Sequence, residues 1–250
     1  MSGHSKWSTI KRKKGAADAR RSNVFAKLLR AVEVAAREGG GSVEGNMTLA
    51  SAVDKARDAS VPNENIERAI KRGTGELEGG ARYEEVSYEG YGPGGVALFV
   101  ECLTDNRNRT AQDVRHAFTR NGGNLGESGS TAWMFQRKGV IQVEKEAAPD
   151  EERLLEIALD AGAEDLADGE STWEIRTDPT ALARVRDAIS AARMPMLSAE
   201  LTMLPQTTVA VEGGQARQVL ALLEALEDLD DVQNVYANFD ISEAELAEMA

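Results

Sequence analysis

Apolar side chains recur at helical spacing in the first third of the chain. Intervals of one, three or four residues separate Phe25, Leu28, Leu29, Val32 and Ala36. This is the spacing of one buried helix face. Ser22 or Asn23 is expected to cap the helix, and Gly39–Gly41 to end it.

Two further helices are predicted behind the first, from about Met47 to Ala59 and from Pro62 to Arg72. Residues 2–21 have no apolar period and are predicted to form a flexible or weakly helical arm. Residues 73–80 are rich in glycine and predict a linker. The first 79 residues are therefore expected to be a basic arm followed by a three-helix domain.

Beyond the linker the apolar period changes to that of strands. Tyr83–Tyr91 and Val96–Leu103 are predicted strands joined by a tight turn at Gly92–Gly95, and Thr110–Arg120 is a predicted helix. Six elements follow in the order βαββαβ, which is that of a ferredoxin-like unit. They are Gly139–Glu144, Asp150–Ala161, Ala163–Ala167, Thr172–Arg176, Pro179–Ala192 and Ser198–Leu204.

The last part of the pattern is a strand, a helix and a strand, at Thr207–Val211, Ala216–Leu226 and Val232–Asn238. The predicted fold class is α+β with three domains. A helical domain, residues 1–79, precedes an α/β domain split into residues 80–137 and 206–250. The ferredoxin-like domain, residues 138–205, is inserted in it. Trp133, Met134 and Phe135 are expected in a core.

The composition is that of a packed soluble protein, with 42% apolar and 28% charged residues. No apolar run is long enough to span a bilayer, and the basic N-terminus lacks the apolar stretch of a secretory signal. Cys102 is the one cysteine, so no disulfide forms within the chain. A cytoplasmic protein without a membrane partner is expected.

The net charge of −13 hides a strong separation along the chain. Residues 1–30 hold nine basic side chains and one acidic one, a charge of +8. Residues 141–250 hold seven basic and twenty-five acidic side chains, a charge of −18. Such a molecule approaches a polyanion with its basic end first.

The basic arm is the main candidate site, because lysine and arginine neutralise phosphates and release counterions. Trp7 lies within the arm at a position without apolar period, where its indole is suited to stack on an unpaired base. The alternative is a solvated tail that only aids solubility. The predicted nucleic-acid contacts are Lys6, Trp7, Lys11, Arg12, Lys13, Lys14, Arg20, Arg21, Lys27 and Arg30.

Asp105–Thr110, between a predicted strand and a predicted helix, is a candidate second contact. Arg107 and Arg109 are placed to clamp a phosphate, and Asn108 to read a base or ribose edge. The alternative is a turn in which Asp105, Asn108 or Thr110 caps the helix. Both interpretations can hold together.

The sequence offers little for catalysis. It has two histidines, His4 and His116, neither near a nucleophile or at metal-ligand spacing, and its glycine strings lack the P-loop pattern. We expect a non-enzyme that needs no cofactor, metal or small-molecule substrate. A metal-dependent nuclease that uses the carboxylates of Glu84–Glu85 or of Asp228, Asp230 and Asp231 is one alternative, and a protein-interaction scaffold is another.

Long and unusual strings of the sequence resemble the YebC family, which includes the mitochondrial translational activator of cytochrome c oxidase subunit one. They extend over nearly the whole chain. The strings are Ser2–Lys11, Ala17–Arg21, Val61–Ile70, Tyr88–Gly95, Thr104–Thr110, Gly122–Gly126 with Trp133–Phe135, and Val232–Phe239.

This resemblance implies a helical domain and two α/β domains, one inserted in the other, which is the plan that the apolar pattern predicts. It also implies a regulator of gene expression that binds nucleic acid through its basic first domain. Family members are labelled DNA-binding transcriptional regulators, or described as ribosome-associated translation factors that relieve stalls such as those at proline runs. The expected partner is therefore DNA or ribosomal RNA, with the ribosome as a further candidate. Because no helix-turn-helix or zinc module is readable, we favour RNA.

Overall fold

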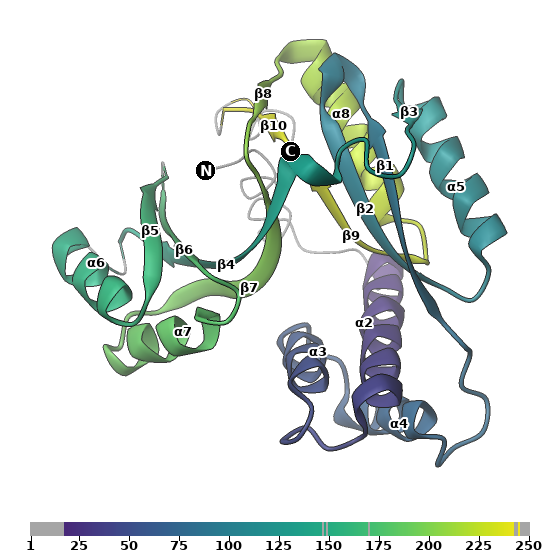
Figure 1. The fold of residues 1–250 in the computed structure, drawn as a ribbon, viewed down its shortest axis with the longest axis horizontal. Coiled ribbons are helices and arrows are strands. Elements are labelled where there is room, and N and C mark those ends of the chain that lie inside the picture. Colours follow the sequence, from purple (N-terminus) through teal and green to yellow (C-terminus); the bar gives the residue numbers. More distant parts are fainter. Residues whose placement is uncertain (1–17, 147, 149, 170, 243–244, 246–250) are drawn as a thin grey trace. The chain divides into compact units, whose positions relative to one another are not determined.

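The computed structural model describes residues 18–146, 148, 150–169, 171–242 and 245 of the chain. They divide into two compact units (Figure 1). Of the described residues, the helix–sheet unit comprises 18–130 and 214–235, and the inserted unit comprises those of 131–213 and those from 236 on. Within the described residues, no helix is long and apolar enough to cross a membrane.

Three helices begin the helix–sheet unit: α2 (Asp18–Gly39), α3 (Met47–Asp58) and α4 (Asn63–Thr74). Asn46 caps α3 by accepting a hydrogen bond from the backbone N–H of Leu49 at 3.0 Å. The shared core confirms the helical period of the sequence. Its buried residues are Val32, Ala35, Ala36, Leu49, Val53, Ala56, Val61, Ile66 and Ala69.

Two expectations for this domain were wrong. The first helix begins at Asp18, so Ser22 and Asn23 lie inside it and do not cap it. Gly73 does not begin a linker but lies inside α4, where a Cβ atom would stand 2.3 Å from the carbonyl oxygen of Glu33 in α2. Glycine at this position therefore allows α2 and α4 to approach closely. The helix ends at Gly75, which has a left-handed conformation.

The sheet of the helix–sheet unit has the strand order β3-β1-β2-β9. Its strands are β1 (Glu84–Tyr91), β2 (Ala97–Thr104), β3 (Asn124–Leu125) and β9 (Val232–Ala237). β1 and β2 are antiparallel with Tyr91 opposite Ala97, which confirms the predicted hairpin, and Gly94 and Gly95 supply the positive φ angles of its turn. Helices α5 (Arg107–Arg120) and α8 (Gly213–Glu227) pack on it.

The inserted unit confirms the ferredoxin-like prediction. Its element order is β4 (Phe135–Glu144), α6 (Glu151–Asp160), β5 (Ala163–Asp168), β6 (Thr172–Thr177), α7 (Leu182–Ala191) and β7 (Met196–Pro205). The sheet order is β5-β6-β4-β7, and every neighbouring pair is antiparallel. Ile141, Trp173 and Ile175 lie in its core.

Several details of this unit differ from the sequence prediction. The strand expected at Thr207–Val211 is reduced to β8 (Val209–Ala210), which pairs in parallel with β10 (Phe239–Asp240). Helix α7 begins at Leu182, three residues after Pro179, because the Asp178 carboxylate accepts hydrogen bonds from Thr180 and holds a turn there. Trp133 was expected in a core but is 66% exposed, whereas Phe135 is buried. The domain boundaries at 79/80, 137/138 and 205/206 stay predictions.

Candidate nucleic-acid interface

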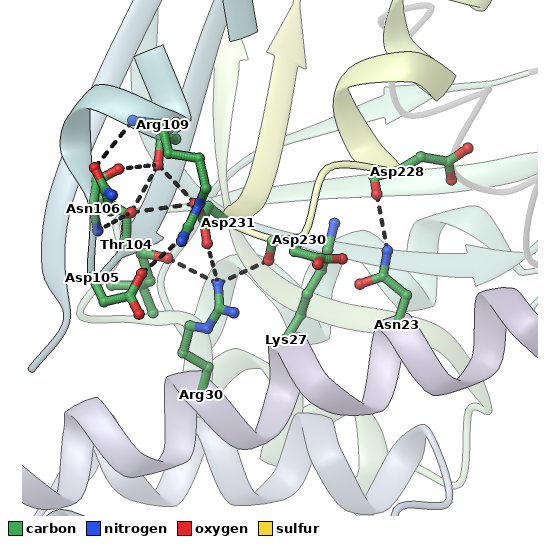
Figure 2. Close-up of polar contacts among 12 residues, drawn as sticks. Asn23, Lys27, Arg30, Thr104, Asp105, Asn106, Arg109, Asp228, Asp230 and Asp231 are labelled. Carbon is green, nitrogen blue, oxygen red and sulfur yellow. Dashed lines mark hydrogen bonds and ion pairs between the residues drawn. The ribbon is translucent and has the colours of Figure 1, made fainter. Parts of the chain in front are cut away.

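Residues 18–21 of the predicted arm form the first turn of helix α2. One side of α2 is bound to the turn between α8 and β9. Asn23, Lys27 and Arg30 are spaced by four and three residues and therefore lie on one side of the helix. We call these three residues the anchoring stripe. The Asn23 amide donates to the carbonyl oxygen of Asp228 at 3.0 Å, and the Lys27 ammonium donates to that of Glu227. Figure 2 shows the stripe facing Asp228, Asp230 and Asp231.

Arg30 makes the most contacts of the three. Its Nη1 donates to the carbonyl oxygens of Leu103 and Asp230 at 3.0 and 2.9 Å, and to Oδ1 of Asp231 at 2.9 Å. The guanidinium also lies 4.9 Å from the centre of the Tyr83 ring, within the range of a cation–π contact. The side chain of Arg30 is only 16% exposed. It therefore joins α2 to the sheet.

Asp231 is the centre of a polar cluster that also contains Arg30, Thr104, Arg109 and Thr110; we call these five residues the Asp231 cluster (Figure 2). While Oδ1 accepts from Arg30, Oδ2 accepts from Arg109 at 2.8 Å, Thr110 at 2.7 Å and Thr104 at 3.2 Å. The Asp231 residue is 5% exposed. One carboxylate thus joins α2, the end of β2 and the start of α5.

The cluster sets the ionisation of its members. Burial alone would raise the pKa of Asp231, but hydrogen bonds from Arg109 and Thr110, together with the charges of Arg109 and Arg30, lower it below the usual value. The hydrogen bond to Asp231 is also the main reason that the pKa of Arg109 is raised. Both groups are therefore charged at neutral pH.

The second candidate site is partly used within the chain. The helix α5 begins at Arg107 rather than Thr110, because Asn106 caps it by accepting from the backbone N–H of Arg109 at 3.1 Å. The sequence predicted a capping turn here, but the capping residue is Asn106 and not Asp105, Asn108 or Thr110. The Arg109 guanidinium binds both Asp105 and Asp231.

The other two members of this site face solvent. Arg107 is exposed and lies 3.8 Å from Glu84, a surface pair that leaves the guanidinium accessible. Asn108 is exposed in the first turn of α5. Contacts of Arg107, Asn108 and Arg109 with nucleic acid stay a prediction.

Among the ten predicted contacts of the arm and first helix, the side chains of Lys27 and Arg30 are described. Lys6, Trp7 and Lys11–Lys14 lie outside the described residues, and so do the side chains of Arg20 and Arg21. The structure brings Lys27 and Arg30 together with the α8–β9 turn, a role that the sequence reasoning missed. The nearest signal for this role in the sequence was the unusual character of two strings: Thr104–Thr110, and Val232–Phe239, which begins directly after Asp231.

Cys102 and Asp231, two groups that could carry chemistry, are both buried in the protein. Cys102 is 2% exposed, as predicted, and burial, followed by the charge of Asp231, raises the pKa of its thiol to about 12. Asp231, a candidate metal ligand, directs both oxygens at protein donors. Across the described part of the chain, no three histidine, cysteine or acidic side chains are grouped to hold a metal ion.

Comparisons with known proteins follow this domain plan. The family described as "TACO1/YebC protein N-terminal domain" matches residues 5–76, and "TACO1/YebC second and third domain" matches residues 83–239. A probable transcriptional regulatory protein of Geobacter sulfurreducens is 57% identical over 249 residues, and one of Rubrobacter xylanophilus is 56% identical over 250 residues. Each pair of chains is covered completely.

A solved structure shows the same fold. The crystal structure of a conserved hypothetical protein of Aquifex aeolicus, Aq1575, is 49% identical to this chain. It superposes with a TM-score of 0.78 and covers 90% of this chain and 92% of the other. The predicted α+β plan, a helical domain followed by two α/β domains, is thereby confirmed.

Proposed function

Because the chain belongs to the TACO1/YebC family, we propose that it is a regulator of gene expression that binds nucleic acid through its basic arm and the start of α2. It acts by binding and positioning, without a catalytic step. The names of its relatives, probable transcriptional regulatory proteins, support the regulatory role.

One observation carries the binding proposal: seven cations between Lys6 and Arg21 lie before, or in the first turn of, a helix that is anchored to an otherwise acidic protein. The anchoring stripe engages Lys27 and Arg30 within the chain. We therefore assign the main phosphate contacts to the seven cations before the stripe. Six such contacts would make log K fall with log salt at a slope of about −4 to −5.

We favour RNA as the bound polymer. A basic arm with a tryptophan suits single-stranded or structured RNA, where unpaired bases are available for stacking. Ribosomal RNA is accordingly the leading target, and a cytoplasmic site of action follows from it. DNA is the second candidate, because the relatives are named as probable transcriptional regulatory proteins.

The test compares two four-residue variants of the full chain. The arm variant replaces Lys11, Arg12, Lys13 and Lys14 by glutamine, and the control replaces the exposed Arg153, Arg186, Arg193 and Arg217 by glutamine. Both remove four charges, but only the arm variant should flatten the salt slope, by about 3. Equal slopes in the two variants would overturn the proposal.

The choice between RNA and DNA needs a second measurement. Co-sedimentation with ribosomes and DNA gel shifts, at matched salt, separate the candidates. Binding to a defined promoter at physiological salt without ribosome association would overturn the preference for RNA.

A further inference from the structure

The solvent-facing side of α5 is polar and basic along its whole length. Four residues turn toward the sheet and are buried: Thr110, Val114, Ala117 and Phe118. The opposite side exposes Asn108, Gln112, Arg115 and Thr119, at spacings of four, three and four residues. Arg120 and His116 are exposed beside them. We call Asn108, Gln112, Arg115, Thr119 and Arg120 the α5 face.

The charge of α5 is opposite to that of the whole protein. The helix has four arginines and one acidic residue, Asp113, in a chain of net charge −13. Arg109 is engaged by Asp105 and Asp231. Among the described residues, in contrast, neither Arg115 nor Arg120 forms an ion pair, so their guanidinium groups are available to an external anion.

The chemistry of this face suits a sugar–phosphate backbone better than a protein surface. Arginine forks bind phosphate oxygens in pairs, and amide and hydroxyl groups reach phosphates, sugars and base edges. Protein interfaces instead centre on buried apolar anchors. None of the exposed large hydrophobic side chains of the described chain lies on α5.

The length and the attachment of the helix also fit. Asn108 and Thr119 are about 16 Å apart along the helix axis, enough to follow several successive phosphates. In addition, α2 and α5 are both bound to the carboxylate of Asp231, through Arg30 and Arg109. The helix that follows the arm and the α5 face are therefore held in one fixed arrangement, which favours simultaneous contact with one polymer.

We propose that the α5 face is a second phosphate-binding surface, which binds the same nucleic acid as the arm through Arg115 and Arg120. This inference rests on the proposed function and extends it beyond the arm.

The experiment measures binding of the full chain to a labelled 20-nucleotide single-stranded RNA and a 20-base-pair DNA duplex across a salt series. Arg115→Gln with Arg120→Gln should flatten the slope by about 1.4 on single strands or 1.8 on duplex. The matched control is Arg153→Gln with Arg186→Gln, both exposed in the inserted unit. Arg115→Lys with Arg120→Lys keeps the charge and should keep the slope, which separates charge from damage to the fold.

The possible outcomes distinguish failure of this inference from failure of the proposed function. If the α5 variant has the slope of the control while the arm variant loses binding, the inference fails and the proposed function stands; an acidic protein surface then becomes the candidate partner. If the wild-type chain binds neither probe at low salt, both fail. A flatter slope in the glutamine pair alone supports the inference.

Discussion

Arg30 and Asp231 are 201 positions apart in the sequence and form a 2.9 Å ion pair that joins α2 to the sheet. The same carboxylate binds Arg109 at 2.8 Å through its other oxygen. A single acidic side chain thus fixes the helix behind the arm and the start of α5. The predictions below separate this structural role from contact with nucleic acid.

Removing the central carboxylate should destabilise the protein. Asp231→Ala leaves Arg30, already mostly buried, and the Thr110 hydroxyl without their shared acceptor. We expect the free energy of unfolding to fall by about 3 kcal/mol, as measured by urea denaturation. The neighbouring, exposed Asp230 offers a control, and Asp230→Ala should change stability by less than about 0.5 kcal/mol. Equal effects would show that the cluster contributes nothing particular.

The contribution of Asp231 should disappear in acid. Its pKa is lowered in the folded protein, so the unfolded chain takes up the proton first as the pH falls. The stabilisation is complete well above the unfolded value of about 3.9 and is lost as the pH falls through the folded pKa. The difference in urea midpoint between the wild type and Asp231→Asn should therefore be constant from pH 5 to 7 and shrink below about pH 4. A difference that did not change with pH would contradict this.

Arg30 tests whether the anchoring stripe also contacts phosphate. If its role is structural, Arg30→Gln lowers stability by about 1–3 kcal/mol and leaves the salt slope of binding unchanged. Arg21→Gln serves as the comparison, with an expected flattening of about 0.7–0.9. A flatter slope for Arg30→Gln as well would instead support the phosphate contact predicted from the sequence.

Trp7 should contribute stacking rather than charge. Trp7→Ala is expected to weaken binding to single-stranded RNA by about 1–3 kcal/mol, with little change in the salt slope because no cation is removed. Fluorescence anisotropy at several salt concentrations measures both quantities. Trp133→Ala, at a tryptophan outside the arm that is 66% exposed, is the control. An affinity unchanged by Trp7→Ala would remove the stacking proposal.

Local pattern was enough for most of the architecture. Helical spacing located α2, α3 and α4, and alternation located the β1–β2 hairpin and the ferredoxin-like unit, because burying one face of an element imposes a period on the sequence. The arm could also be recognised as a polyanion-binding candidate from charge alone, because basic residues gather in the first thirty positions and acidic residues in the last part of the chain.

Contacts between distant segments were decided only by the tertiary structure. Nothing near Arg30 in the sequence indicates that Asp231 receives it, because an ion pair across 201 positions leaves no local period. The close packing at Gly73 could not be predicted either, because glycine occurs both in linkers and where two helices cross closely. Residue types and their order therefore determine the elements and their charge, whereas the roles of Arg30, Arg109 and Asp231 arise when folding brings their side chains within hydrogen-bonding distance.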